Sequence, residues 1–376
     1  MNSMSARIPL FKIYWDEADI KSVTKSLKTG MNWSIGQNIG SFEQKIGRYV
    51  GTEYATVFNS GTSALHSALL AYGVGTADEV IVPSFTFVAT ANAPLFVGAK
   101  PVFADIEDET FGLDPEDVNE RITKHTKAII PVHYGGCPCK ITELTQIAQD
   151  HDLVLIEDAA ESFGAKIEES RVGAFGDSAM FSFCQNKIIT TGDGGAITTD
   201  SKQLRDRLEL IRSHGQFETL HGLEQEKSSD YIALGYNFRM SNIIAALGIA
   251  QLDKVDAIID MRRRNANYLT SKLKREGQDV VTPVPPRGYY HVYQMYTIRH
   301  PARDQLMSHL FNQGIMTKVY FPPVHQSYFY REVLNCSSRL PVTEELAGQV
   351  LTLPLWPHMK EAEMNYVVDA ICSLSR

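Results

Sequence analysis

Two residues at the ends of neighbouring apolar segments, an aspartate and a lysine, have the types and spacing to support cofactor chemistry. Asp158 follows the apolar run 153–156, and Lys187 comes 29 positions later, just after a second apolar segment over 179–183. Pyridoxal phosphate needs such a pair. A lysine amine holds the cofactor aldehyde as a Schiff base, and a carboxylate keeps the pyridine nitrogen protonated so that the ring accepts electrons.

Each of these residues also has an ordinary structural interpretation. Most lysines are solvated surface cations, but Lys187 precedes the glycine-rich turn 190–195, which brings backbone close to another group. Asp158 could cap a helix over the following residues 159–165. It also ends a predicted strand, and ligands of open α/β sheets bind at that edge. Their positions therefore favour a site role for both.

A Gly/Ser/Thr-rich turn between a predicted strand and a predicted helix is a candidate phosphate site. The segment 53–58 reads as a strand, and apolar residues at helical spacing follow over 65–72. The turn 59–63 between them would present free backbone N–H groups and the positive end of a helix dipole. Alone, such a turn more often marks a helix cap.

The elements that must position these residues read as an α/β fold. Short buried strands alternate with helical patterns such as 141–151, which predicts a mainly parallel sheet covered by helices. The predicted strands are 79–83, 101–106, 127–132, 153–158, 178–183 and 195–199.

A smaller α/β lobe is predicted to follow. A long helix over 241–274 would lead out of the first lobe. Strand-like segments over 294–299 and 315–321 then flank a helix-like 303–314, and a last amphipathic helix covers 360–374.

Length and pattern together predict two domains. A chain of 376 residues is long for one core. We expect a large domain over 1–255, whose N-terminal segment could pack on the other domain, and a small domain over 256–376.

Composition and charge exclude several classes of function. The net charge is −8 and basic residues are spread out, apart from the run 262–264, so nucleic acid is a poor partner. No apolar run is long enough to span a membrane. The N-terminus has no basic stretch before a long apolar core, which is the pattern of a secretory signal, so no such signal is expected. Cys137 and Cys139 lack a second pair at metal-ligand spacing. We expect a cytoplasmic protein with free thiols and no metal site.

The motifs of this chain also resemble those of a known family, the DegT/DnrJ/EryC1/StrS group of sugar aminotransferases. The resemblance runs from Ile8 to Met359, and the motifs recur in the expected order. They are SGTSAL at 60–65, VPSFTFVAT at 82–90, EDAAE at 157–161, FSFCQNK at 181–187 and GYNFRMSN at 235–242. The resemblance implies a fold-type-I pyridoxal phosphate enzyme, with a large cofactor-binding domain and a small C-terminal domain.

The resemblance also implies roles for individual residues. Lys187 would be the Schiff-base lysine and, once free, would carry a proton between cofactor and substrate carbons, which needs an amine of lowered pKa. Asp158 would be the partner of the pyridine nitrogen. The other cofactor-binding residues implied are Gly61, Thr62, Ser63 and Ser182 at the phosphate, Phe87 on the pyridine face, Glu161 beside the cofactor oxygen, and Asn237 from the neighbouring subunit of a homodimer.

Two of these assignments need comment. Phe85 would share one strand face with Phe87, so the choice of Phe87 depends on the resemblance. Glu161 departs from the family, which often has Gln or His at this place. Its carboxylate would need to be protonated, or bonded to a donor, beside the cofactor oxygen.

The residues of the substrate side are less specific. His133 and Tyr134 could line a sugar pocket, and Arg239 could bind nucleotide phosphates or a donor carboxylate. The further candidates are Trp33, His214 and His325. A structural role in a loop is an equal alternative for each.

The reaction implied is transamination in two halves. L-Glutamate would leave pyridoxamine phosphate, whose amine then goes to the keto carbon of a nucleotide-linked sugar. The segments IPLFKI (8–13) and GMNWSIG (30–36) resemble members that aminate 4-keto-6-deoxy sugars. GDP- or UDP-linked sugars of the perosamine or bacillosamine-precursor kind are therefore expected, giving 4-amino-4,6-dideoxy sugars for surface glycans.

Three alternatives stay open. The chain could aminate a 3-keto sugar or a cyclitol. It could belong to the sugar dehydratase branch, whose members carry His where this chain has Lys187. It could also be a non-catalytic regulator, which could lose Lys187 or Asp158 and would usually carry a DNA-binding extension. This chain keeps both residues, which favours the aminotransferase.

Overall fold

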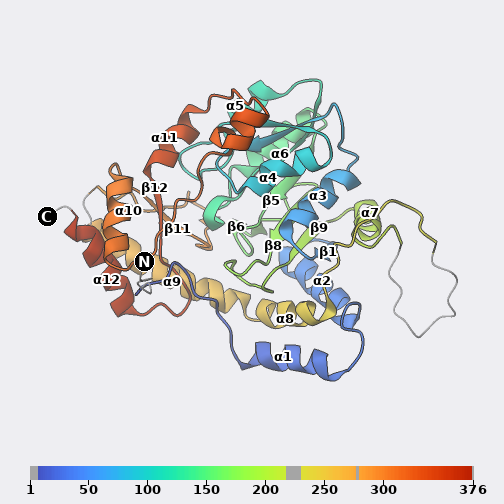
Figure 1. Cartoon of the computed structure of the whole chain (residues 1–376), viewed down its shortest axis with the longest axis horizontal. Helices are drawn as coiled ribbons and strands as arrows, with labels where there is room; N and C mark the ends of the chain where they lie inside the picture. The colour runs from blue at the N-terminus through green and yellow to red at the C-terminus, as the bar shows by residue number, and fades with distance from the viewer. Residues whose placement is uncertain (1–6, 217–229, 277–278, 375–376) are drawn as a thin grey trace.

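A seven-stranded sheet organises the computed structural model, which describes residues 7–216, 230–276 and 279–374 (Figure 1). Residues 1–6, which belong to the N-terminal stretch where no secretory signal is expected, lie outside the described residues. The strand order is β1-β9-β8-β5-β4-β2-β3. The strands are β1 Tyr54–Phe58, β2 Glu79–Pro83, β3 Lys100–Ala104, β4 Thr126–Ile129, β5 Val154–Asp158, β8 Ser178–Ser182 and β9 Gly195–Thr199. Only β9 runs in the direction opposite to the other strands of this sheet, so the predicted α/β class with a mainly parallel sheet is confirmed.

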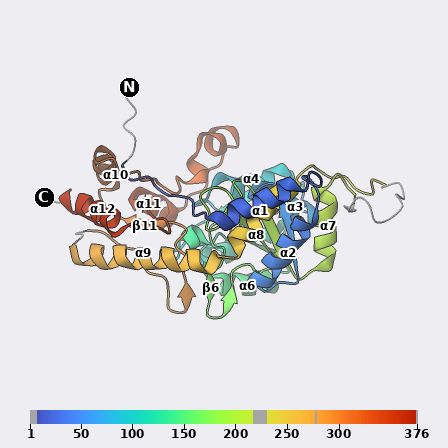
Figure 2. The same cartoon turned by 90° about the horizontal axis from the view of Figure 1, so that it is seen from below.

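Helices cover both faces of this sheet because successive strand residues point to opposite sides. Val80 and Val82 pack into one core with α3 Gly61–Ala71, α4 Val88–Phe96 and α7 Lys202–Arg212. Ile81 points the other way, toward α5 Pro115–Arg121 and α6 Ile141–Asp150. On that second face, α2 Gln37–Val50 and α8 Asn242–Leu252 cover β1, β8 and β9. α1 Glu17–Lys28 packs outside α8 (Figure 2).

The C-terminal part has its own core around a two-stranded ladder. β11 Tyr296–Arg299 pairs antiparallel with β12 Val350–Leu353. The helices around it are α10 Arg303–Asn312, α11 Pro341–Gln349 and α12 Glu361–Ser373. Smaller elements are β6 Lys166–Ile167, β7 Ser170–Arg171 and β10 Tyr289–Tyr290, with single turns at Tyr134–Gly136, Val324–Gln326 and Phe329–Val333. Ile8 is buried in this C-terminal core and pairs with Ile315.

The predicted long helix over 241–274 is wrong in one respect, because the structure has two helices there. α8 ends at Leu252 and α9 Val255–Glu276 begins after a break. At the break, the Lys254 ammonium contacts Asp16 at 2.6 Å and Asp19 at 2.7 Å. The helical periodicity continues across the break, and the acidic partners are remote in sequence, so the pattern could not reveal it.

α9 belongs to two cores at once. Ile258 and Ile259 pack with the central sheet, whereas Leu269 and Leu273 pack with the C-terminal ladder. Figure 1 shows this helix running from below the sheet to the C-terminal helices. We therefore propose that α9 is shared by the two domains, rather than that the second domain begins cleanly at residue 256.

The predicted strand over 315–321 is also wrong. Only Ile315 and Lys318 make single bridges there, and the edge of β11 is occupied by β12, which the sequence analysis missed. Pro322 and Pro323 follow at once, and proline cannot donate to a strand ladder. The segment instead crosses toward the C-terminal edge of the central sheet.

One buried histidine, His291, should make the stability of the fold sensitive to acid. His291 stacks on Tyr293 with ring centroids 4.0 Å apart, and its Nδ1 accepts the Tyr293 N–H. Burial lowers the pKa of His291 to about 3. The unfolded side chain, with a pKa of about 6.5, takes up a proton that the folded one does not. The free energy of unfolding should therefore fall by about 2 kcal/mol between pH 7 and pH 5.

Urea denaturation of the wild type and of His291→Asn at both pH values measures this contribution. Asparagine can still accept the Tyr293 N–H but does not titrate. The variant should lose less stability on acidification than the wild type, by that same amount. Equal losses would mean that His291 is not held neutral in the folded protein.

Candidate active site

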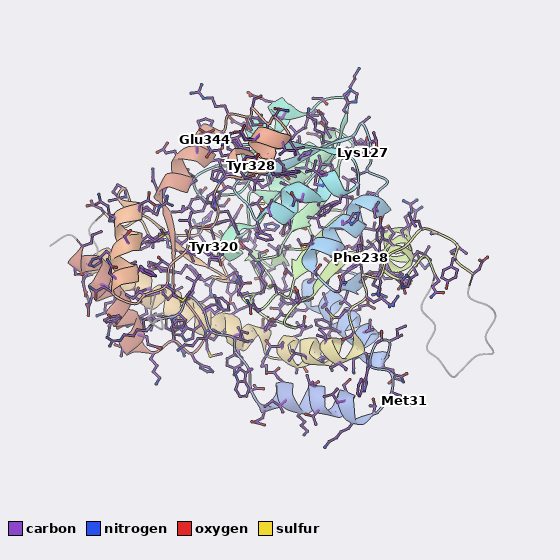
Figure 3. The ribbon with its side chains drawn as sticks, viewed as in Figure 1. Met31, Lys127, Phe238, Tyr320, Tyr328 and Glu344 are labelled. Carbon is purple, nitrogen blue, oxygen red and sulfur yellow. The ribbon has the colours of Figure 1, made fainter. Side chains whose placement is uncertain are left out.

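A cavity of about 310 Å³ lies where the parallel strands β2, β4, β5 and β8 end. Ligands of open α/β sheets bind at this edge. The residues that line it are Ser60, Gly61, Thr62, Thr86, Phe87, Ala89, Thr90, Val132, Asp158, Ala160, Glu161, Met180, Ser182, Cys184, Asn186, Lys187, Asp193, Lys318, Tyr320 and Phe321. Figure 3 shows Tyr320 in the middle of the molecule, between the central sheet and the C-terminal helices.

Asp158 lies at the end of β5 with its carboxylate turned into this cavity. Oδ2 accepts the Thr90 hydroxyl at 2.7 Å, and Oδ1 accepts the Ala160 N–H at 3.1 Å. Burial raises the pKa of this carboxyl, and the Thr90 hydrogen bond opposes that rise. A cationic ligand would stabilise the ionised form of this buried carboxyl, which has few hydrogen-bond donors, because a nearby opposite charge favours ionisation.

Lys187 lies in the turn after β8, with its ammonium 3.6 Å from Glu161 Oε1. Glu161 is buried, and its Oε2 accepts the Gly135 N–H at 2.9 Å. Burial raises the pKa of the Glu161 carboxyl, and the charge of Lys187 opposes that rise. The requirement that Glu161 be bonded to a donor is thus met by the backbone of Gly135.

The N-terminus of α3 closes one end of the cavity. Gly61 and Thr62 occupy its first two positions, where N–H groups have no intrahelical acceptor. A Cβ on Gly61 would lie 3.0 Å from Met180 Sδ and 3.2 Å from Ser182 Cβ. Glycine therefore lets the helix start approach β8, and free N–H donors meet the Ser182 hydroxyl in a cradle that suits a phosphate.

Ser63 is not brought to the cavity. Its hydroxyl donates to Asn59 Oδ1 at 2.5 Å, and its N–H donates to Ser60 Oγ at 3.1 Å. The cap residue Ser60 lines the cavity in its place. The sequence analysis missed this because Ser60 and Ser63 are equally good hydroxyl donors until the helix start is fixed.

Phe87 and Phe85 are separated clearly by the structure. Phe87 caps α4 and is 60% exposed along the cavity wall, whereas Phe85 is completely buried. Phe321 faces Phe87 with ring centroids 6.2 Å apart. An open aromatic face at the cavity is available to stack on a planar ligand.

His133 and Tyr134, predicted for a sugar pocket, are buried behind the cavity wall. His133 Nδ1 accepts the Cys139 N–H at 3.1 Å, so the proton is on Nε2, which donates to Glu157 at 3.0 Å. The Tyr134 hydroxyl donates to the Tyr320 carbonyl. Both side chains hold loops in place and line no part of this cavity.

His325 is likewise a structural residue. Its Nδ1 lies 2.7 Å from Ser84 Oγ, and its Nε2 lies 3.3 Å from Glu344. Burial lowers the pKa of His325. The buried ring links the loop after β2 to the segment that carries Phe321, and it does not line the cavity.

The four remaining candidates lie outside this cavity. Trp33 is 49% exposed and donates from Nε1 to the Leu27 carbonyl. Arg239 donates to Ser213 Oγ at 3.2 Å. His214 and Asn237 are exposed in segments that pair beside α7, near Phe238 in Figure 3. Their predicted roles stay predictions.

Several lining residues were not predicted. Thr90 lies one helical turn after Phe87, a spacing that could have revealed it. Lys318, Tyr320 and Phe321 come from the segment that was read as a strand, so no sequence signal placed them here. In the described part of the chain, no group of three His, Cys, Asp or Glu side chains could hold a metal ion. No helix among those residues is long and apolar enough to cross a membrane.

The cavity fits pyridoxal phosphate on its own chemistry. It combines an amine at Lys187, a buried carboxylate at Asp158, an open aromatic face at Phe87 and N–H donors at Gly61 and Thr62. The cofactor presents an aldehyde, a pyridine nitrogen, a planar ring and a phosphate, which match these groups one for one.

Comparison with known proteins identifies the chain. The sequence pattern of the DegT/DnrJ/EryC1/StrS aminotransferase family matches residues 14–372. The chain is 38% identical over 343 residues to GDP-perosamine synthase of Caulobacter vibrioides, covering 90% of each chain. It is 37% identical over 339 residues to a UDP-N-acetyl-3-dehydro-alpha-D-glucosamine 3-aminotransferase of Acidithiobacillus ferrooxidans, covering 90% of this chain and 88% of that one.

The fold agrees with the sequence match. Spr1654 from Streptococcus pneumoniae has been solved in a PLP-form and a PMP-form. The PLP-form superimposes with a TM-score of 0.90 at 25% identity, covering 98% of each chain. The PMP-form gives a TM-score of 0.91 at the same identity, covering 98% of this chain and 99% of that one. The chain therefore belongs to the DegT/DnrJ/EryC1/StrS aminotransferase family and is a pyridoxal phosphate-dependent enzyme.

Proposed function

We propose that this enzyme moves an amino group from L-glutamate to the keto carbon of a nucleotide-linked 4-keto-6-deoxy sugar, giving a 4-amino-4,6-dideoxy sugar. The observation that carries the proposal is one cavity lined by the Lys187 amine, the Asp158 carboxylate and the open aromatic face of Phe87. A non-catalytic regulator needs neither the lysine nor the aspartate, and a dehydratase of this fold has histidine in place of Lys187.

Different residues of the cavity would bind different parts of the cofactor. Gly61, Thr62 and Ser182 would hold the phosphate, and Phe87 would stack on the ring. Asp158 would pair with the ring nitrogen, and Glu161 would interact with the ring oxygen. When bound, the cofactor supplies an electron sink that accepts the pair left on a substrate carbon when its proton departs.

Lys187 would take and return that proton. Its side chain extends into the cavity from the turn after β8, where its amine would be available for this transfer. Glu161, 3.6 Å away, holds the ammonium form in place between transfers. Phe87 and Phe321 supply apolar walls to the same cavity, with ring centroids 6.2 Å apart.

The choice of carbon 4 is supported by relatives. The chain is slightly more similar to the GDP-perosamine synthase, which makes a 4-amino sugar, than to the 3-aminotransferase. Amination of a 3-keto sugar or a cyclitol is the second candidate, favoured by the latter relative. The free thiols Cys137, Cys139, Cys184 and Cys336 support a reducing compartment such as the cytoplasm.

A spectroscopic experiment tests the proposal. The holoenzyme is converted to its amine form with L-glutamate, the donor is removed, and 4-keto-6-deoxy sugars linked to GDP, UDP or dTDP are added singly. Return of the aldehyde-form absorbance with one of them is expected. If glutamate acts but no 4-keto sugar reverses its effect, the carbon-4 assignment fails. If glutamate has no effect, it is not the donor.

We also propose a homodimer in which Asn237 reaches the neighbouring active site. Asn237 is exposed and does not line the cavity of its own chain. Trp15, Met31 and Trp33 are exposed apolar side chains at the two ends of α1, and a second subunit would cover side chains of this kind. Analytical ultracentrifugation of the holoenzyme would show a monomer if this proposal is wrong.

Two phenylalanine variants should affect different properties, one the cofactor affinity and the other the stability of the fold. Phe87→Ala should raise the dissociation constant for pyridoxal phosphate about tenfold, because a stacking face is lost, with little change in stability, because the ring is 60% exposed. Phe85→Ala should lower the free energy of unfolding by about 3–5 kcal/mol, because that ring is fully buried. Cofactor titration and urea denaturation measure the two effects. Equal cofactor affinity in Phe87→Ala and wild type would remove Phe87 from the site.

A further inference from the structure

Lys318 is a lining residue of the active-site cavity that the proposed function does not use. It comes from the segment between α10 and the turn Val324–Gln326, so it faces the cavity from the C-terminal part of the chain. Lys187, the other lysine of the cavity wall, comes from the central sheet side. The cavity therefore has two amines on two different walls.

The backbone of Lys318 is fixed, although the segment around it has no regular structure. Its N–H donates to the Thr352 carbonyl at 3.2 Å, and the Thr352 N–H donates back to the Lys318 carbonyl at 2.9 Å. Thr352 lies in β12, inside the C-terminal core. This reciprocal pair makes Lys318 a defined point on the cavity wall, in contrast to a lysine on a free loop.

The side chain is held as well. The Lys318 ammonium lies 4.6 Å from the centroid of the Tyr320 ring, within the range of a cation–π contact. Tyr320 is itself half-buried and lines the same cavity. The contact keeps the ammonium against the cavity wall, so that part of the entropy of ordering a long side chain is already lost before a ligand binds.

Among the residues that the structure describes, the charge of Lys318 has no acidic partner, since no carboxylate lies within 4.0 Å of its ammonium. The buried acids of the cavity have other partners, since Glu161 contacts Lys187 and Asp158 accepts from Thr90. The phosphate cradle is at the start of α3, formed by other residues. The Lys318 ammonium is therefore a positioned cation that is available to an anionic group other than the cofactor phosphate.

We propose that Lys318 binds an anionic group of the substrates, and so helps to set which substrates the cavity accepts. This inference rests on the proposed function, because that function brings two such anions to one cavity. They are a carboxylate of the amino donor and the diphosphate of the nucleotide-linked sugar. Both need a hydrogen-bonded cation at the pocket wall.

Binding measurements on the holoenzyme separate the two sources. Glutarate serves as an unreactive dicarboxylate, and GDP, UDP and dTDP serve as diphosphates, each titrated by calorimetry. Lys318→Met keeps the length of the side chain and its packing on Tyr320 but removes the charge. It should weaken binding of at least one probe class about tenfold or more, whereas Lys318→Arg should stay within about threefold of wild type. The class that weakens names the anion.

Lys127→Met is the matched control. Lys127 is an exposed lysine of β4 that Figure 3 shows at the outer edge of the molecule, far from Tyr320. The Lys127→Met variant should bind every probe with the same affinity as wild type. The inference is overturned if Lys318→Met also binds both classes as wild type does, or if wild type binds neither. The reaction of wild type with L-glutamate, followed in the same preparation, reports separately on the proposed function.

Discussion

Lys187→Ala should lower turnover by at least about 10⁴-fold, the upper end of what a positioned acid–base group contributes, because the same amine also anchors the cofactor. The absorbance of lysine-linked cofactor should disappear, although the phosphate cradle at Gly61 and Thr62 should still bind the cofactor weakly. Stopped-flow spectroscopy of the half-reaction with L-glutamate measures the first effect. A simple absorbance spectrum of the purified protein measures the second.

The fold should survive this change. Without the ammonium at 3.6 Å, the buried Glu161 carboxyl loses the charge that opposes the rise of its pKa. The pKa of this carboxyl should then rise further, which favours its neutral form and lowers the cost of keeping it buried without the ammonium. Lys127→Ala, at an exposed site on β4, provides the control for removing a lysine. A Lys187→Ala enzyme that retained a tenth of wild-type turnover would contradict the assigned role.

Asp158→Asn should lower kcat by about 10³-fold while leaving the lysine linkage intact. At a separation of about 4 Å and an effective dielectric constant of about 20, a carboxylate stabilises a protonated ring nitrogen by about 4 kcal/mol. This energy corresponds to a factor of about 10³ in rate. An amide cannot supply this charge. Asparagine can still accept the Ala160 N–H and donate to the Thr90 hydroxyl, so the local structure should be kept.

Thr90→Val serves as the graded comparison for Asp158→Asn. The valine removes the hydroxyl that donates to Asp158 Oδ2 but keeps the carboxylate itself. It should therefore reduce kcat by about tenfold, the usual worth of one hydrogen bond to a charged group. If Asp158→Asn lowers kcat no more than Thr90→Val does, the Asp158 carboxylate acts only as a structural hydrogen-bond acceptor. Steady-state kinetics with saturating substrates gives both numbers.

The sequence was sufficient to predict that three candidate residues lie beside one cavity. Asp158, Ser182 and Lys187 end or follow the apolar runs that became β5 and β8, and all three line it, as the rule that ligands bind at strand ends predicts. The same rule misplaced His133 and Tyr134, which also follow a strand. Their side chains turn inward to Glu157 and to the Tyr320 carbonyl, and a sequence does not state that direction.

The C-terminal wall of the cavity could not be predicted for a different reason. Lys318, Tyr320 and Phe321 reach the site because β12, rather than their own segment, pairs with β11. The local patterns of the apolar segments 315–321 and 350–353 are nearly equivalent, so periodicity does not indicate which of them pairs with β11. The outcome depends on Pro322, Pro323 and the tertiary bridge between Lys318 and Thr352, which act over a separation that periodicity does not cover.

The shared helix α9 has a mechanical consequence. Its first turns are embedded with the central sheet and its last turns with the C-terminal ladder. An α-helix resists bending, so sharp bends need a proline, a glycine pair or a bulge, and α9 contains neither proline nor glycine. The helix is therefore a stiff connection between the central sheet and the C-terminal core. We expect it to limit how far the wall that carries Lys187 and the wall that carries Lys318 can move relative to each other.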